Sequence, residues 1–297
     1  APGTLDLGSD PALRGYWLDL FRRHIRQTVA LVARDYPDAP EMSARMRKAA
    51  ARFVAHVDAV AADPAARFDT LSLCEVRERC LRAAGVADPY RRTKDRESDA
   101  ALRLLPALLA ELDALPEPVR LDALVRGIFA GNVFDLGSHA TASLFARGGA
   151  AFHDVRERLQ PRPWLVDDLD ALGVRLRRGV SSALLFVDNA GSDVVLGMLP
   201  FARELLRRGA HVLLSANETP ALNDVTHEEL GAVLVRAASR DAMLGSALAD
   251  GRLSRISSGG GLPLLDLRQL SAPLQDAIAR RPPDLVVLEG MGRAIES

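Results

Sequence analysis

The sequence predicts an α/β protein in which a helical N-terminal region packs on a Rossmann-like, three-layer α/β/α domain with a mainly parallel sheet. Two observations carry this prediction. Up to about residue 165, apolar residues recur at the intervals of amphipathic helices. From about residue 180, short and wholly apolar runs alternate with helical patterns, which is typical of strands buried on both faces of a parallel sheet.

The N-terminal region, residues 1–165, is expected to be almost purely helical. Its amphipathic patterns are separated by breaks that contain proline or glycine. They span residues 13–34, 42–62, 71–84, 99–115 and 119–130. The segment Pro161–Arg162–Pro163 is the expected junction with the C-terminal domain, residues 166–297.

The C-terminal domain is expected to alternate strands and helices. Predicted strands cover residues 183–187, 211–215, 264–267 and 284–288, and predicted helices cover residues 193–208, 226–238 and 272–281. Because strands joined through helices pair in parallel with right-handed crossovers, this order predicts a parallel sheet.

Composition narrows the class of protein. The net charge of −1 provides no global field that would recruit nucleic acid or an anionic membrane. No apolar run reaches the roughly 18 residues of a membrane span, and no basic stretch followed by an apolar run marks a signal peptide. The two cysteines, Cys74 and Cys80, lack a metal-binding spacing. We therefore expect a cytoplasmic protein with reduced thiols that binds neither nucleic acid nor a membrane.

Three polar clusters follow the predicted strands. Residues 188–193 (Asp-Asn-Ala-Gly-Ser-Asp), residues 217–224 and residues 289–293 (Glu-Gly-Met-Gly-Arg) each come directly after an apolar run. Ligands of parallel α/β sheets bind beyond the carboxyl ends of the strands. Three clusters that converge on one edge would form a site, whereas each alone would be a loop.

The oxygen-bearing side chains of these clusters suit a divalent metal. Asp188 and Asn189 place a carboxylate beside an amide carbonyl, and Asp224 adds a second carboxylate. Such hard ligands favour Mg²⁺ or Mn²⁺ and leave positions for water and phosphate. The alternative is that Asp188 and Asn189 form a turn or a helix cap. For Asp193, a helix cap is the favoured interpretation, and Arg293 could clamp a phosphate.

Two segments of the first half are further candidates. The segment Gly131–Asn132–Val133–Phe134–Asp135 either joins two helices or brings an Asn and an Asp to the site. The charge run 91–97 is expected to be solvated surface, unless Lys94 or Arg96 reaches a substrate phosphate. No His-x-x-x-His pair, Gly-x-Ser-x-Gly elbow or P-loop lysine motif is present, which argues against those hydrolase and nucleotide-binding classes.

Taken together, these motifs resemble the metal-dependent damage-control phosphatase family, long catalogued as a domain of unknown function. The matching segments are residues 131–135, 186–209, 217–226 and 289–293, within a resemblance that covers roughly residues 85–293. The Glu-Gly-Met-Gly-Arg motif is similar to that of one subfamily. Its members include plant stand-alone enzymes and the phosphatase domain fused to an inactive pantothenate kinase homologue in animals.

The resemblance implies a divalent metal (Mn, Mg, Co or Ni) bound by Asp188, Asn189 and Asp224, with Asp188 and Asp224 essential for catalysis. It implies hydrolysis of a small phosphorylated metabolite, either 4'-phosphopantetheine and its oxidised forms or a sugar phosphate. Substrate would contact the remaining polar residues of the motifs, Asn132, Asp135, Asn217, Glu289 and Arg293. In the family, further chain with a phosphate-contacting lysine follows this last motif, so we expect the sequence to continue beyond Ser297.

Several alternatives remain at this point. A non-catalytic phosphometabolite-binding module of the same fold would leave the acid pair Asp188 and Asp224 beside a phosphate, which is costly without a cation. A methyltransferase would need a longer glycine-rich loop after the first strand. For the reaction, either Asp188 attacks phosphorus or a metal-activated water attacks in line. We favour water, because Asp188 and Asn189 must both face the metal and Asp193 is expected to point away.

Overall fold

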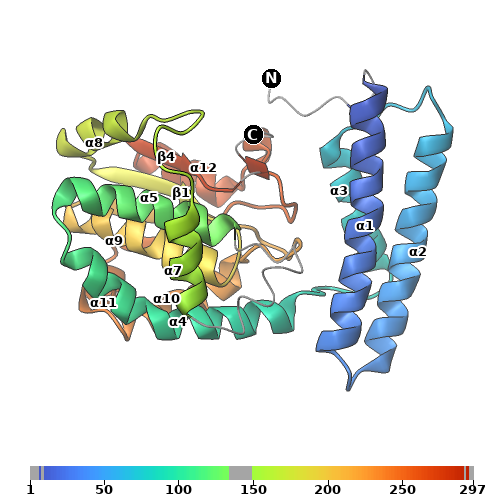
Figure 1. Cartoon of the computed structure of the whole chain (residues 1–297), viewed down its shortest axis with the longest axis horizontal. Coiled ribbons are helices and arrows are strands. Elements are labelled where there is room, and N and C mark those ends of the chain that lie inside the picture. Colours follow the sequence, from blue (N-terminus) through green and yellow to red (C-terminus); the bar gives the residue numbers. More distant parts are fainter. Residues whose placement is uncertain (1–6, 8–9, 134–148, 291, 294–297) are drawn as a thin grey trace.

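The computed structural model describes residues 7, 10–133, 149–290 and 292–293, without the side chains of residues 149–151. A bundle of three helices stands beside an α/β unit (Figure 1). The bundle consists of α1 (Pro11–Asp35), α2 (Pro40–Ala62) and α3 (Thr70–Ala83). It has its own hydrophobic core, with Ile25, Phe53 and Leu73 at its centre.

Local sequence signals set the ends of these helices. The carboxylate of Asp10 caps α1 by accepting hydrogen bonds from the backbone N–H groups of Ala12 and Leu13. At α3, Asp69 and Ser72 form a capping box. Proline occupies the first turn of α1 and of α2, where a missing N–H costs nothing.

Helices α4 (Arg91–Asp113) and α5 (Glu117–Val133) pack with the sheet. Their buried leucines share one hydrophobic core with the strands, together with residues of α7 (Gly149–Arg158) and α8 (Leu169–Arg177). The apolar contacts therefore give α1 to α3 a core of their own, which Val86 and Leu262 also join. The division at residues 165 and 166 stays a prediction about domains.

The sheet has four parallel strands in the order β3-β2-β1-β4. They are β1 (Ser182–Phe186), β2 (His211–Ala216), β3 (Leu253–Ser257) and β4 (Leu285–Leu288). This arrangement confirms the predicted fold class and three of the predicted strands. The strand predicted at 264–267 is wrong: the third strand is β3. It lies at an edge and is mostly polar, so it has no continuous apolar run.

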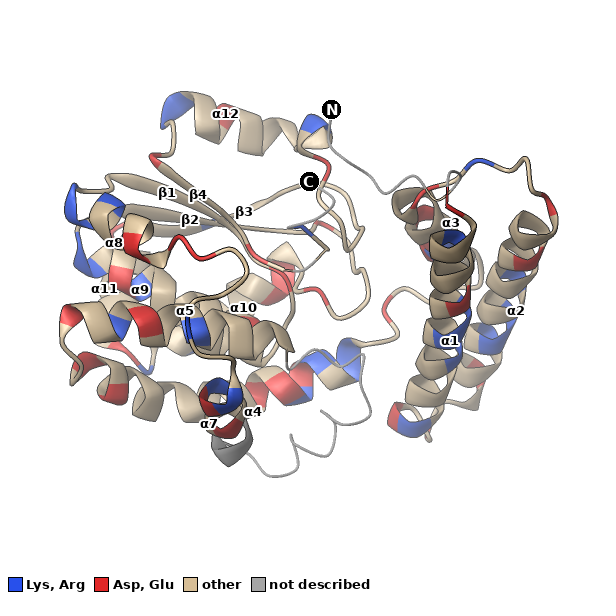
Figure 2. Cartoon of the chain, turned by 45° about the horizontal axis from the view of Figure 1, so that its top comes forward, with Lys and Arg blue, Asp and Glu red and all other residues tan. Residues whose placement is uncertain are grey.

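Helices cover both faces of the sheet. Figure 2 shows α12 (Ala272–Arg280) above the strands and α5, α9 (Leu199–Arg207) and α10 (His227–Ala238) below them. Alternate residues of β1 supply the two cores: Leu184 and Phe186 pack on the α12 side, whereas Ala183 and Leu185 pack on the other. The remaining elements are the π-helix η1 (Asp193–Met198), α11 (Ala242–Ala249) and the short helix η2 (Leu267–Gln269).

Helix α5 crosses η1 at very short range. A Cβ atom on Gly131 would lie 2.8 Å from the Cα atom of Asp193, and one on Gly197 would lie 3.1 Å from the Cα atom of Ile128. Glycine at both positions lets the two backbones touch, which brings the end of α5 against the loop after β1. None of the described helices is long and apolar enough to cross a membrane.

Candidate metal and phosphate site

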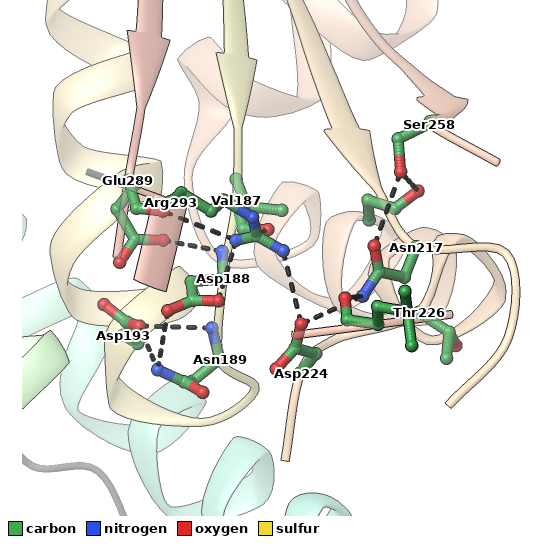
Figure 3. A network of polar contacts seen from close by, with 12 residues as sticks. Val187, Asp188, Asn189, Asp193, Asn217, Asp224, Thr226, Ser258, Glu289 and Arg293 are labelled. Atoms are coloured by element: carbon green, nitrogen blue, oxygen red, sulfur yellow. Dashed lines mark hydrogen bonds and ion pairs between the residues drawn. The ribbon is translucent and has the colours of Figure 1, made fainter. Parts of the chain in front are cut away.

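Polar side chains gather at the point where the strand order reverses. The chain runs from β1 through β2 to β3 on one side and returns on the other side as β4. Parallel α/β sheets bind ligands in the crevice at this position. Asp188 and Asn189 follow β1, Glu289 follows β4, and Asn217 follows β2, as Figure 3 shows.

Asp188 is the hub of the site. One carboxylate oxygen, Oδ1, lies 2.8 Å from Nη1 of Arg293. The other, Oδ2, accepts hydrogen bonds of 3.3 Å from the amides of Asn132 and Asn189. The backbone N–H of Asp188 donates to Oε2 of Glu289 over 2.6 Å. Asp188 is only 9% exposed, so protein groups rather than water stabilise its negative charge.

Asp193 belongs to the site, and the expectation that it caps the following helix is wrong. It is the first residue of η1 and is 1% exposed. Its Oδ2 accepts from the backbone N–H of Asn189 at 3.1 Å, from Asn189 Nδ2 at 2.9 Å and from Asn132 Nδ2 at 3.1 Å. The close crossing of α5 and η1 brings Asn132 to this carboxylate, a contact that the local sequence cannot reveal.

Asp224 reaches the same site from the loop after β2. Its Oδ2 lies 3.3 Å from Nη2 of Arg293 and accepts a 2.9 Å hydrogen bond from Nδ2 of Asn217. A backbone bridge pairs Asn189 with Asp224, and the N–H of Val225 donates to the carbonyl of Asp188. The two loops therefore form one unit, as their positions after adjacent strands led us to expect.

Arg293 lies inside the site. It is 3% exposed, pairs with Asp188 and Asp224, and donates a 2.7 Å hydrogen bond to the carbonyl oxygen of Val187. The structure brings together most of the predicted site residues: Asp188, Asn189, Asp224, Asn132, Asn217, Glu289 and Arg293. Asp135 lies outside the described residues.

Lys94 of the charge run supports the site indirectly. It is 1% exposed, and its Nζ lies 2.7 Å from Asp88 and 2.8 Å from Glu229. The same nitrogen donates to the backbone carbonyl of Asp224 over 3.3 Å. The solvated-surface interpretation is therefore wrong for Lys94. Arg96 pairs with Asp35 of the bundle.

The acidic side chains carry more charge than their surroundings offset. Asp188, Asp193 and Glu289 place ligand oxygens within 4.8 Å of one another, and the ion pairs of the described residues join Arg293 alone to this group and Asp224. Burial and the neighbouring Asp188 raise the pKa of Asp193 to about 7. Burial, Asp193 and Asp188 likewise raise the pKa of Glu289. A bound divalent cation would offset this repulsion, so the donor set fits a metal.

Comparisons with known proteins identify the family. Residues 20–296 match the family described as the damage-control phosphatase ARMT1-like domain. "Damage-control phosphatase At2g17340" of Arabidopsis thaliana is 40% identical over 95% of this chain and 77% of its own length. "4'-phosphopantetheine phosphatase" of Mus musculus is 32% identical over the whole of this chain.

The chain spans only part of some relatives. It covers 42% of the mouse protein and 36% of a 40%-identical Arabidopsis thaliana protein named "Pantothenate kinase 2". Among solved structures, a DUF89 family protein of Pyrococcus horikoshii aligns with a TM-score of 0.61 and 18% identity. That alignment covers 94% of this chain and 85% of the archaeal one, and it shows a shared fold.

A glycine gives a direct test of how tightly the site is packed. Gly290 has φ 108°, and a Cβ atom there would lie 2.2 Å from Oδ2 of Asp188. Gly209 has φ 89° with open space around it. Both Gly→Ala changes introduce backbone strain of about 1–3 kcal/mol, and Gly290→Ala must also displace Asp188. Chemical denaturation should show a larger loss of stability for Gly290→Ala, and equal losses would contradict the described packing.

Proposed function

The chain belongs to the damage-control phosphatase ARMT1-like family, and from that premise we propose that it is a divalent-metal-dependent phosphatase of small phosphomonoesters. The observation that carries this proposal is the concentration of buried carboxylates at the switch point of the sheet, where Arg293 is the guanidinium that the described residues place between them. A bound divalent cation would offset this negative charge and could then attract a substrate phosphate.

We assign the metal to Asp188, Asn189 and Asp224. Arg293 marks where positive charge is stabilised, between Oδ1 of Asp188 and Oδ2 of Asp224. Asp193 accepts from Nδ2 of Asn189 and so turns the amide oxygen of Asn189 away from itself, available to a metal. The alternative ligand set is Asp188 with Asp193 and Glu289.

The remaining polar side chains of the site hold its carboxylates in position. Nδ2 of Asn132 lies within hydrogen-bond distance of Asp188, Asp193 and Glu289, and its two hydrogens hold these carboxylates close together. Asn217 holds Asp224 through a 2.9 Å hydrogen bond. We propose a holding role for Asp188 over attack on phosphorus, because its carboxylate must face the metal together with Asn189 and Asp224. When bound, the metal would neutralise phosphate oxygens and supply an activated water.

For the substrate, the relatives favour a phosphorylated metabolite of the pantetheine type. The mouse relative is named a 4'-phosphopantetheine phosphatase. We propose 4'-phosphopantetheine or a damaged form of it as the first substrate to test, with sugar phosphates as the second class. We also propose that the protein acts in the cytoplasm, a reducing compartment that suits its free cysteines Cys74 and Cys80.

Metal titration tests the ligand assignment. By isothermal calorimetry with Mn²⁺, Asp188→Ala and Asp224→Ala should lose detectable binding, because each removes a charged ligand. Asp193→Asn should weaken binding by about ten- to hundredfold, as expected for a group that orients a ligand. The control Asp276→Ala changes an exposed acid on α12. Wild-type affinity in Asp224→Ala would assign the metal to Asp193 and Glu289 instead.

Phosphate release tests the activity. Wild-type protein should hydrolyse p-nitrophenyl phosphate and members of a phosphometabolite panel with Mn²⁺, Mg²⁺, Co²⁺ or Ni²⁺, and chelation should stop it. Asp188→Asn should be inactive, whereas Asp276→Asn should match the wild type. Full activity after chelation would contradict metal dependence. Tight binding of panel members without hydrolysis would support the alternative, a phosphometabolite-binding module.

A further inference from the structure

Helix α4 packs a polar face against both loops that carry the proposed metal ligands. Lys94 and Ser98 lie one turn apart on this helix, so their side chains share a face. Lys94 donates a 3.3 Å hydrogen bond to the backbone carbonyl of Asp224, in the loop after β2. Oγ of Ser98 accepts a 3.2 Å hydrogen bond from the backbone N–H of Gly191, in the loop after β1. One helix face therefore holds both loops.

The contact between α4 and the loop after β1 is close. Gly191 has φ 78°, and a Cβ atom there would lie 2.9 Å from the Cβ atom of Glu97. Glycine suits both the positive φ and the short approach of the helix. Because Gly191 comes two residues after Asn189, α4 holds the backbone directly beside the proposed ligands Asp188 and Asn189.

Apolar packing fixes the same helix to the sheet. Leu102 and Leu105 of α4 are fully buried, and they belong to the hydrophobic core that includes Leu185 of β1. The two loops are also joined to each other by the backbone bridge between Asn189 and Asp224. The helix, the sheet and the loops thus form a closed arrangement, which limits how far the ligands on one loop can move relative to those on the other.

Lys94 can hold its loop without repelling a cation. Its Nζ lies 2.7 Å from Asp88 and 2.8 Å from Glu229. These two carboxylates offset the ammonium charge, whereas an unopposed buried ammonium would disfavour a divalent ion nearby. The hydrogen bond to the carbonyl of Asp224 is therefore available to position the loop.

We propose that Lys94 and Ser98 are positioning residues that fix the spacing between Asp188 and Asn189 on one loop and Asp224 on the other. The proposal rests on the metal assignment of the proposed function. It adds that α4 sets part of the affinity for the metal through groups that do not bind the metal themselves. Groups that orient metal ligands typically change metal affinity by about ten- to hundredfold.

Calorimetric titration with Mn²⁺ tests these roles. The double variant Lys94→Met, Asp88→Asn removes the ammonium group but loses one positive and one negative charge together, so the local net charge is kept. We expect its dissociation constant for Mn²⁺ to be at least about tenfold higher than that of the wild type, because the loop with Asp224 is no longer held. The single variant Ser98→Ala removes one hydrogen bond and should raise the dissociation constant about two- to tenfold.

A matched control separates positioning from stability. Arg203 is 9% exposed, and its Nε lies 3.0 Å from Oδ2 of Asp241. The double variant Arg203→Met, Asp241→Asn therefore also removes a buried cation and one of its acids. It should be less stable to chemical denaturation and should retain the wild-type affinity for Mn²⁺. An equal loss of affinity in this control would overturn the proposal, and so would wild-type affinity in Ser98→Ala, which keeps every buried charge.

Hydrogen exchange of the metal-free protein distinguishes this proposal from the metal assignment. The N–H of Gly191 donates to Ser98, and the N–H of Val225 donates to the carbonyl of Asp188. Peptides that cover these amides should exchange at least about tenfold faster in Ser98→Ala and in the Lys94 variant, as followed by mass spectrometry. Faster exchange without Mn²⁺ binding by the wild type would support the positioning role and contradict the metal assignment. Unchanged exchange would overturn the positioning role.

Discussion

The site depends on holding several carboxylates together out of water. Asp188, Asp193, Asp224 and Glu289 are each at most 9% exposed, and Arg293 is the cation that pairs with this group among the described residues. Each buried charge is costly unless it is paired or hydrogen-bonded. The protein meets this cost with amide donors, chiefly Asn132 and Asn189, and with the guanidinium. These buried carboxylates would be stabilised further by a bound cation.

The packing around the carboxylates follows from that constraint. Gly131 lets α5 approach Asp193 closely enough for Asn132 to reach three acids. Gly290 leaves room for the carboxylate of Asp188. Lys94, anchored by Asp88 and Glu229, reaches the backbone of Asp224 from α4. Residues far apart in sequence thus fix a few oxygen positions, which is what a metal site requires.

Most of the sheet and most of the candidate site residues could be predicted from the sequence. The apolar runs of β1 and β2 reflect their burial between helices, and β4 is also wholly apolar although it is a partly exposed edge strand. The polar residues directly after these strands had to meet at one end of the sheet. Edge strand β3 was missed because most of its residues are polar, so it has no continuous apolar run. Asp193 and Lys94 were misjudged because their roles come from helix crossings between distant segments, which leave no local pattern.

The central claim is that a divalent metal occupies the position between the loops after β1 and β2. Anomalous diffraction at the manganese edge, from crystals of the protein soaked in Mn²⁺, would locate it directly. The account predicts one anomalous peak within bonding distance of Asp188, Asn189 and Asp224, with the guanidinium of Arg293 displaced from between the two carboxylates. A peak bound by Asp193 and Glu289 without Asp224, or no peak at this edge of the sheet, would contradict it.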